Sequence, residues 1–171
     1  MKLKGQQVKG AYVETVVIPR TPSVVVREDG SKEEVPNYHV FKLAAVLDYD
    51  DFEKLCPQPD PPLIQYPGGK TGKNVEDSKY KKAQYDWSML RYTWAFLKSL
   101  QATPDLEWET VDYGKPETWQ NYEKELKDAG FSVNEIGRII TGFHIANNMD
   151  ETKMEAARKH FLAQEQVQPV R

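Results

Sequence analysis

A stretch rich in proline and glycine near residue 60 divides the chain into two parts with different hydrophobic periods. It holds five prolines between residues 57 and 67 and three glycines between 68 and 72. Proline removes backbone donors and favours extended chain, whereas glycine adds backbone freedom. Apolar residues alternate before this stretch and recur every three to four residues after it. The sequence predicts an α+β chain with a small N-terminal antiparallel β module (1–56), a Pro/Gly-rich linker (57–76) and a C-terminal helical bundle of about four helices (77–171).

The N-terminal part has the composition of β-strands. Stretches 11–18, 23–27 and 35–47 are rich in β-branched and aromatic residues, and Pro19 is expected to end the first. The pair Asp29-Gly30 predicts a hairpin turn. Three strands are about the minimum for an independently stable sheet. The third stretch also suits a helix from about residue 40, and an acidic first turn favours a short helix over 48–55.

The most strongly patterned segment after the linker is residues 77–101. Tyr80, Trp87 and Trp94 recur every seven residues, as on the apolar face of a long helix. Residues 106–111 alternate like a short edge strand. Pro116 and Gly130 mark the start and the end of a second helix over 116–129.

Two further helices are expected at the C-terminal end. Ser132 and Glu135 form a capping box for a helix over 132–148, and a last helix is expected over 150–164. The apolar positions of these helices predict a C-terminal core, made of Phe131, Ile136, Ile140, Phe143 and Phe161.

Composition argues against several functional classes. The chain of 171 residues has 23 basic and 26 acidic side chains, whereas dedicated nucleic-acid binders usually have a basic excess. One cysteine excludes an internal disulfide framework, and no apolar run reaches the 18 residues of a membrane span. The N-terminus lacks the apolar region of a signal peptide. We therefore expect a protein of a reducing compartment with no membrane or nucleic-acid partner.

No catalytic or metal-binding constellation is indicated. The glycines and lysines of residues 67–74 do not have the spacing of a phosphate-binding loop. His39, His144 and His160 lack the spacing of metal ligands. Cys56 has carboxylates nearby, which disfavour a reactive thiolate. The pair Glu107 and Glu109 lacks a convergent basic group, so we expect no enzyme activity, no cofactor and no metal.

Large aromatic residues of the helical part are the candidate site. They have two interpretations, as packed core or as a partner-docking surface, because aromatic residues contribute much of the buried area in both. The candidate partner-binding residues are Trp87, Trp94, Trp119 and Tyr122.

Residues 60–163 resemble a family of phage proteins. The similarity lies in packing and capping residues rather than in a catalytic signature. It includes Pro67-Gly68-Gly69, Tyr80-x-x-Ala83, Trp94-x-x-x-Lys98-Ser99-Leu100, Leu106-Glu107-Trp108-Glu109-Thr110-Val111, Pro116-x-x-Trp119-x-x-Tyr122 and Glu135-Ile136-x-Arg138-Ile139-Ile140. In these segments the chain resembles the tail assembly chaperones of long-tailed, non-contractile (siphovirus-like) bacteriophages. The β-rich residues 1–47 lie outside the similarity.

The resemblance implies a non-enzymatic role in virion morphogenesis. Such chaperones bind the tape measure protein, shield its apolar helices and assist assembly of the tail tube protein. The implied partners are these two phage proteins, the implied location is the bacterial host cytoplasm, and a homo-oligomer is compatible with the role. The alternative is a permanent structural virion protein, such as a head–tail connector or a minor tail component.

Overall fold

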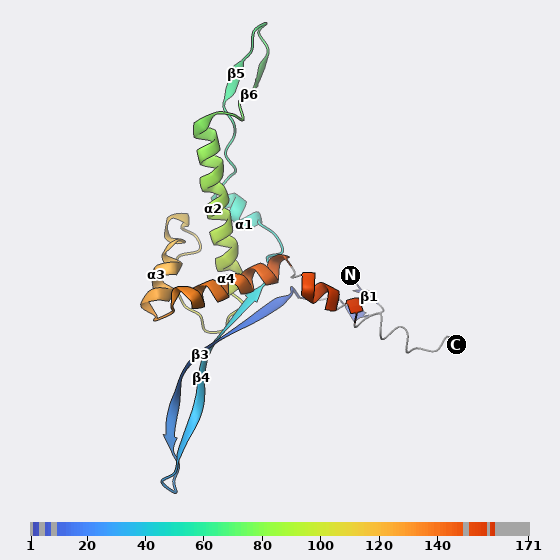
Figure 1. Ribbon diagram of the computed structural model, residues 1–171. Coiled ribbons are helices and arrows are strands. Elements are labelled where there is room, and N and C mark those ends of the chain that lie inside the picture. The colour runs from blue at the N-terminus through green and yellow to red at the C-terminus, as the bar shows by residue number, and fades with distance from the viewer. Residues whose placement is uncertain (1, 4–5, 8–9, 149–150, 157, 160–171) are drawn as a thin grey trace, which may run out of the picture.

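Two long arms leave a small core in opposite directions (Figure 1). The computed structural model describes residues 2–3, 6–7, 10–148, 151–156 and 158–159. One arm is the hairpin of β3 (Val13–Val26) and β4 (Lys32–Ala44). The other arm combines helix α2 (Ser78–Leu100) with a small hairpin of β5 (Leu63–Gln65) and β6 (Thr71–Lys73). The predicted α+β class, with an N-terminal antiparallel β module followed by helices, is confirmed.

The N-terminal β module differs from the expected three strands. Strands β3 and β4 form a two-stranded antiparallel sheet, and within the described residues β1 (Lys2–Leu3) pairs only with β2 (Gln6–Gln7). Strand β3 continues through Pro19 to Val26, with an irregularity between Arg20 and Ser23. Proline is tolerated there because each strand of a hairpin has one unpaired edge. The helical alternative from residue 40 is wrong, because the third stretch is strand as far as Ala44.

The predicted turn at Asp29-Gly30 joins the two strands. Gly30 has φ +79°, and its N–H donates to the Arg27 carbonyl at 2.9 Å. Asp29 has no positive φ, so the loop is of the three-residue type that ends in a left-handed glycine. The Asp29 carboxylate accepts hydrogen bonds from the Ser31 N–H and hydroxyl, which fixes the tip.

The predicted linker contains more structure than expected. Helix α1 (Asp50–Leu55) precedes it and covers the core with Phe52. Residues 57–62 have no regular secondary structure, and the antiparallel β5–β6 hairpin follows. Strands of three residues are too short to be recognised from an alternating pattern.

Helix α2 has the expected extent, and only its second half is buried. Asp77 caps it, since its carboxylate accepts the Tyr80 N–H at 2.9 Å. Its buried residues lie between Thr93 and Leu100. Near its C-terminal end, Ser99 Oγ donates to the Ala44 carbonyl at 2.7 Å, and the Thr103 hydroxyl bonds both backbone groups of Lys42. These side chains occupy part of the free edge of β4, which would otherwise be open to association.

In the segment between α2 and α4 (Val133–Asn148), the structure differs from two predictions. Residues 106–111 form no strand, because the Glu125 carboxylate accepts the backbone N–H groups of residues 109–111 that a neighbouring strand would have bound. The helix predicted over 116–129 is a 3-10 turn η1 (Pro116–Thr118) followed by α3 (Asn121–Asp128).

The C-terminal helix signals hold in the structure. Gly130, with φ +87°, ends α3, and the Phe131 N–H donates to the Leu126 carbonyl as in a Schellman motif. The capping box is formed, since Glu135 accepts the Ser132 N–H at 2.7 Å and donates its own N–H to the Ser132 hydroxyl at 3.3 Å. Residues 151–156 and 158–159 are helical, and the remainder of the helix predicted over 150–164 lies outside the described residues.

A single core joins the hairpin to the helices. It contains Ile18, Phe41 and Leu43 from β3–β4, Phe52 from α1, residues from the second half of α2, and Trp119, Leu126, Ile136, Ile139, Phe143 and Ala146. Of the predicted core, Ile136 and Phe143 are buried, Phe131 and Ile140 are partly buried against it, and Phe161 lies outside the described residues. Helix α4 packs on the sheet through Gly142, where a Cβ would lie 2.4 Å from Val16 Cγ2.

Candidate partner-binding site

The predicted aromatic residues form one cluster around a residue that the sequence did not single out. The Phe52 ring lies 5.5, 5.9 and 6.1 Å from the rings of Trp87, Trp94 and Trp119, respectively. Tyr122 contacts Phe96 of α2, with 5.0 Å between ring centroids. Helix α1 has only six residues, too few for a periodic signal that marks Phe52 as central.

Burial separates the four candidate residues into two pairs. Trp119 is fully buried and Trp94 is 3% exposed, so both belong to the interior of the free chain. Trp87 and Tyr122 are partly buried and lie at the margin of the core. The Trp87 indole donates to the Cys56 carbonyl at 2.9 Å, which fixes the ring against the segment after α1. Of the four residues, Trp87 and Tyr122 are therefore the ones that offer surface to a partner.

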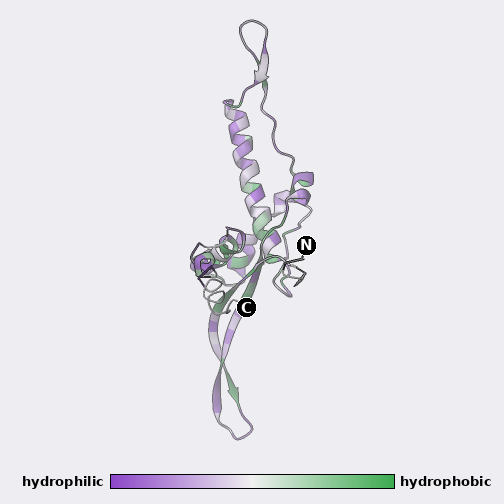
Figure 2. Cartoon of the chain, turned by 90° about the vertical axis from the view of Figure 1, so that its right-hand side faces the viewer, coloured by the Kyte–Doolittle hydropathy of each residue, from purple (hydrophilic) through white to green (hydrophobic). Residues whose placement is uncertain are grey.

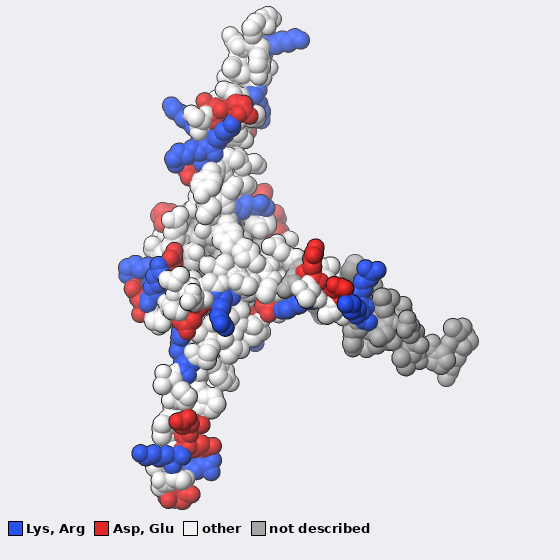
Figure 3. All heavy atoms as spheres, in the orientation of Figure 1, with Lys and Arg blue, Asp and Glu red and all other residues white. Residues whose placement is uncertain are grey.

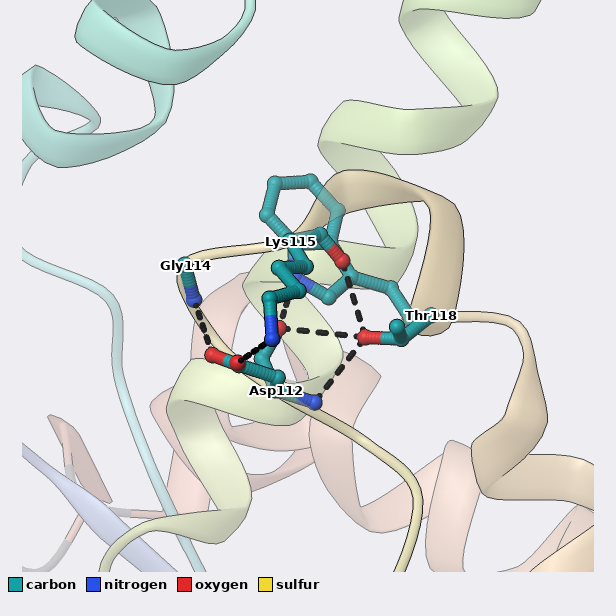
Figure 4. Close-up of polar contacts among 5 residues, drawn as sticks. Asp112, Gly114, Lys115 and Thr118 are labelled. Atoms are coloured by element: carbon teal, nitrogen blue, oxygen red, sulfur yellow. Dashed lines mark hydrogen bonds and ion pairs between the residues drawn. The ribbon is translucent and has the colours of Figure 1, made fainter.

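A tight turn at Asp112 holds Trp119 in the core (Figure 4). The Asp112 carboxylate accepts the Gly114 N–H, and the Trp119 indole donates to the Asp112 carbonyl at 3.0 Å. Thr118 Oγ1 accepts the Asp112 N–H at 2.9 Å. Hydrogen bonds from Lys115 and then from the Gly114 backbone lower the pKa of Asp112 below its ordinary value. Asp112 therefore stays ionised and paired with Lys115, which suits a structural element rather than an acid–base group.

An arginine stacks beside this cluster. The Arg91 guanidinium lies 3.9 Å from the centre of the Tyr49 ring and 5.7 Å from that of Trp87. Its Nε is buried and has no hydrogen-bond partner among the described residues. Cation–π contact stabilises a guanidinium in such a place. A small hollow of about 190 Å³ lies here, lined by Tyr49, Ser88, Arg91, Tyr92, Ala95 and Phe143.

A groove of about 530 Å³ lies between β4, the loop after α2 and the end of α3. Its apolar lining comes from Val40, Phe41, Leu106, Trp108, Leu126, Ala129 and Phe131. Its carboxylates are Asp105, Glu107, Glu109, Glu125 and Asp128, and neither Lys nor Arg lines it. We call this feature the acidic groove. These carboxylates lie at least 61 residues after β4, the strand that forms the opposite wall, so sequence spacing could not predict the groove.

Glu125 shapes the acidic groove. Its carboxylate accepts the N–H groups of Glu109, Thr110 and Val111 at 2.8, 2.7 and 3.1 Å, and the Thr110 hydroxyl as well. Partial burial alone would raise the pKa of Glu125, but the hydrogen bonds from Thr110 and these backbone groups outweigh it and lower the pKa. Asp128 pairs with Lys124. Asp105, Glu107 and Glu109 form no side-chain hydrogen bond or ion pair within the described part of the chain, and they leave the rim negative.

The β3–β4 hairpin exposes apolar side chains where it leaves the core. We call residues 21–38 the distal hairpin. In Figure 2 apolar segments continue along this arm away from the helices. The exposed fractions of Val24, Val25, Val26 and Tyr38 are 57, 48, 61 and 56%. Such side chains on a projecting two-stranded arm have no core to cover them, and contiguous exposed apolar surface marks interaction sites.

The polar groups considered as catalytic or metal ligands are dispersed. His39 contacts Phe131, and His144 lies 3.0 Å from the Tyr92 hydroxyl. His160 lies outside the described residues. Burial raises the pKa of Cys56, which disfavours its thiolate. Within the described residues no group of three His, Cys, Asp or Glu side chains is placed to hold a metal ion, and no helix is long and apolar enough to cross a membrane.

Comparison with known proteins gives no relative. No protein-family model, no curated protein and no solved structure matches this chain.

Proposed function

We propose that this chain is a tail assembly chaperone of a long-tailed, non-contractile bacteriophage. In this role it binds the tape measure protein and assists tail tube assembly without catalysing a reaction. The resemblance of residues 60–163 supplies the family, and the exposed apolar side chains of the distal hairpin are the observation that carries the proposal. A chaperone of this kind must present apolar surface that is tolerated in water and covered on binding.

The distal hairpin suits this role because it combines apolar contact area with solubilising charge. Val24 and Val25 lie opposite Glu34 and Glu33, respectively, in the sheet register. Figure 3 shows acidic and basic side chains together at the end of this arm. The valines supply contact area for an apolar helix, and the charges oppose self-aggregation of the free protein. The partly buried Trp87 and Tyr122 remain the proposed contacts on the helical side.

The experiment is co-expression of the full chain with the phage's tape measure protein. We expect the tape measure protein to stay soluble and to co-purify with the chain, because binding lowers the concentration of its aggregating form. The variant Val24→Lys/Val25→Lys removes the apolar surface while placing each lysine opposite a glutamate, so the fold is retained and capture is lost. The control Thr21→Lys/Ser23→Lys adds the same charge at exposed polar positions of the same arm. Equal capture by both variants would contradict the proposal.

The second candidate is a permanent virion component, a head–tail connector or minor tail protein. The observation that favours it is the pair of oppositely directed arms in Figure 1, because two separate projecting surfaces on one copy allow contacts with two neighbouring subunits in a ring or filament. The two roles differ in the mature particle. Mass spectrometry of purified virions should not find a chaperone, whereas stoichiometric copies in the particle would establish the structural role.

A further inference from the structure

The β5–β6 hairpin is a preformed element whose side chains have no apolar cover in the described chain. We call residues 63–73 the finger. Its strands pair from Leu63 and Lys73 to Gln65 and Thr71, and it extends beyond the N-terminal end of α2 (Figures 1 and 2). Leu63 is 72% exposed and Tyr66 is 51% exposed. Exposed apolar residues gathered on a projecting hairpin mark a surface that a partner covers.

The turn of the finger is fixed by its own sequence. Gly68 and Gly69 have φ of +93° and +79°, values that a residue with a side chain rarely adopts. The Tyr66 N–H donates to the Lys70 carbonyl at 2.8 Å, and the Gly69 N–H donates to the Tyr66 carbonyl at 3.1 Å. The Tyr66 ring covers Gly72, where a Cβ would lie 2.8 Å from ring atom Cε2. Little conformational freedom is therefore lost when the finger binds.

The finger and the acidic groove are complementary in charge and polarity. The finger contains Lys70 and Lys73 and no Asp or Glu; Lys73 pairs with Asp60 at its base, so Lys70 is the lysine of the finger that is free to meet a carboxylate of the groove. In the view of Figure 3 its far end carries a basic side chain and no acidic one. The groove has an apolar lining and a rim with three unpaired carboxylates, and no Lys or Arg lines it. A basic hairpin with exposed Leu63, Ile64 and Tyr66 is the occupant that this surface fits.

The two features cannot meet within one chain. The finger precedes the N-terminal end of α2, whereas residues 103–109 of the groove follow its C-terminal end. A helix of 23 residues holds these ends about 34 Å apart. We propose that the finger of one copy docks in the acidic groove of a second copy. This contact is heterologous, so each copy keeps one free finger and one free groove, and association continues into a ring or a filament.

This inference goes beyond the chaperone proposal and does not depend on it. The experiment is sedimentation velocity of the full chain at low ionic strength, up to about 100 μM, which detects contacts with Kd in the micromolar range. We expect the average mass to rise with concentration and to fall when salt screens the charges. A chain that stays monomeric throughout would overturn the proposal.

Three variants test the two surfaces. Leu63→Ser/Lys70→Ser disables the finger, and Glu107→Gln/Glu109→Gln disables the groove. The control Val24→Ser/Lys32→Ser makes the same kinds of substitution, one apolar residue and one lysine to serine, on the distal hairpin. The first two should remain monomeric, and the third should associate like the wild type. All the substituted side chains are exposed, and a thermal melt of each variant checks the fold.

Mixing the two disabled variants separates a specific contact from a general loss of solubility or fold. Each supplies the surface that the other lacks, so an equimolar mixture should form one native contact and stop at a pair, twice the monomer mass of 19.7 kDa. A mixture that stays monomeric would overturn the proposal. So would a finger variant that associates like the wild type, or a distal-hairpin variant that loses association to the same extent.

Discussion

At the scale of single residues, two positions decide how the helices meet the sheet and the loop. Gly142 allows α4 to approach β3. The Glu125 carboxylate accepts the backbone N–H groups of residues 109–111, which in a sheet would bind a neighbouring strand. Each acts on residues distant in the sequence. Their substitution should therefore have effects that local propensity does not predict.

Gly142→Ala should destabilise the protein by about 1–3 kcal/mol, although alanine favours helices. The new Cβ would lie 2.4 Å from Val16 Cγ2 and 3.1 Å from Leu43 Cδ1, and overpacking of this kind outweighs the gain in propensity. Gly137 lies in the same helix with nothing within 4 Å of a Cβ, so Gly137→Ala should stabilise by about 0.5–1 kcal/mol. Urea denaturation of the two variants measures the difference. Equal effects would place Gly142 away from the sheet.

Glu125→Gln should lower stability near neutral pH by about 1–3 kcal/mol, because one amide oxygen replaces two carboxylate oxygens toward three N–H groups. The folded pKa of Glu125 lies below its ordinary value of 4.5, so the unfolded chain binds more protons in the acid range and stability rises with pH there. The contribution of the Glu125 carboxylate to the free energy of unfolding is present above about pH 4.5 and is lost as pH falls through the pKa of Glu125 in the folded protein.

Thermal melts between about pH 3 and 7 test the acid dependence. The wild type should lose more stability on acidification than Glu125→Gln does. Glu123→Gln is the control, because Glu123 lies on the same helix and pairs with the exposed Lys127. If the two variants followed the same pH profile, the hydrogen bonds of Glu125 would not control this loop.

At the scale of elements, a helix of only six residues contacts three tryptophans through one side chain. Helix α1 places Phe52 among Trp87, Trp94 and Trp119, so one side chain joins α1, α2 and the turn before α3. Phe52→Ala should cost about 3–5 kcal/mol, as for other buried aromatic residues truncated to alanine. Leu55→Ala, at a 43% exposed position of the same helix, should change stability by less than about 0.5 kcal/mol.

Chemical denaturation followed by tryptophan fluorescence measures both α1 variants. Loss of Phe52 admits water beside three indoles, so the emission of the folded Phe52→Ala protein should also shift to longer wavelength. Unchanged emission and stability would mean that α1 lies on the surface of the core rather than within it.

Elements with local signals could be predicted from the sequence, whereas elements made by distant contacts could not. The cap at Ser132, the left-handed Gly130 and the turn at Gly30 each depend on residues within a few positions, and each occurs where the sequence predicts it. The strand predicted over 106–111 fails because its backbone donors bind Glu125, at least fourteen residues away. Strand β3 passes Pro19 because a hairpin edge needs no donor there.

The candidate site was predictable in composition but not in placement. Heptad spacing selected Trp87 and Trp94 as one apolar stripe, yet only Trp94 lies in the buried half of α2. Which half is buried depends on where the hairpin and α1 pack, and no spacing within α2 encodes that. The acidic groove needs β4, the loop after α2 and α3 together, so it exists only at the level of the folded chain.

At the scale of the whole molecule, the core and the distal hairpin should be separable. The buried residues of the hairpin, Ile18, Phe41 and Leu43, all lie on the core side of the paired residues Arg20 and Asn37. Beyond this pair every residue from 21 to 36 is exposed. Replacing residues 21–36 with Asn-Gly, a pair suited to a two-residue turn, should therefore leave the core and its register intact.

The shortened chain should melt close to the wild type, because it keeps every buried side chain and the link from Arg20 to Glu135 of α4. For a chain of this size about 1 kcal/mol corresponds to 2–4 °C, so we expect a change of the melting temperature of less than about 4 °C. Capture of the tape measure protein should be lost, since the exposed valines are removed, while self-association through the finger and the acidic groove should remain. Calorimetry, co-purification and sedimentation measure the three properties on one variant. A shortened chain that unfolds would make the distal hairpin part of the folding unit, and one that still captures the tape measure protein would move the binding surface to Trp87 and Tyr122.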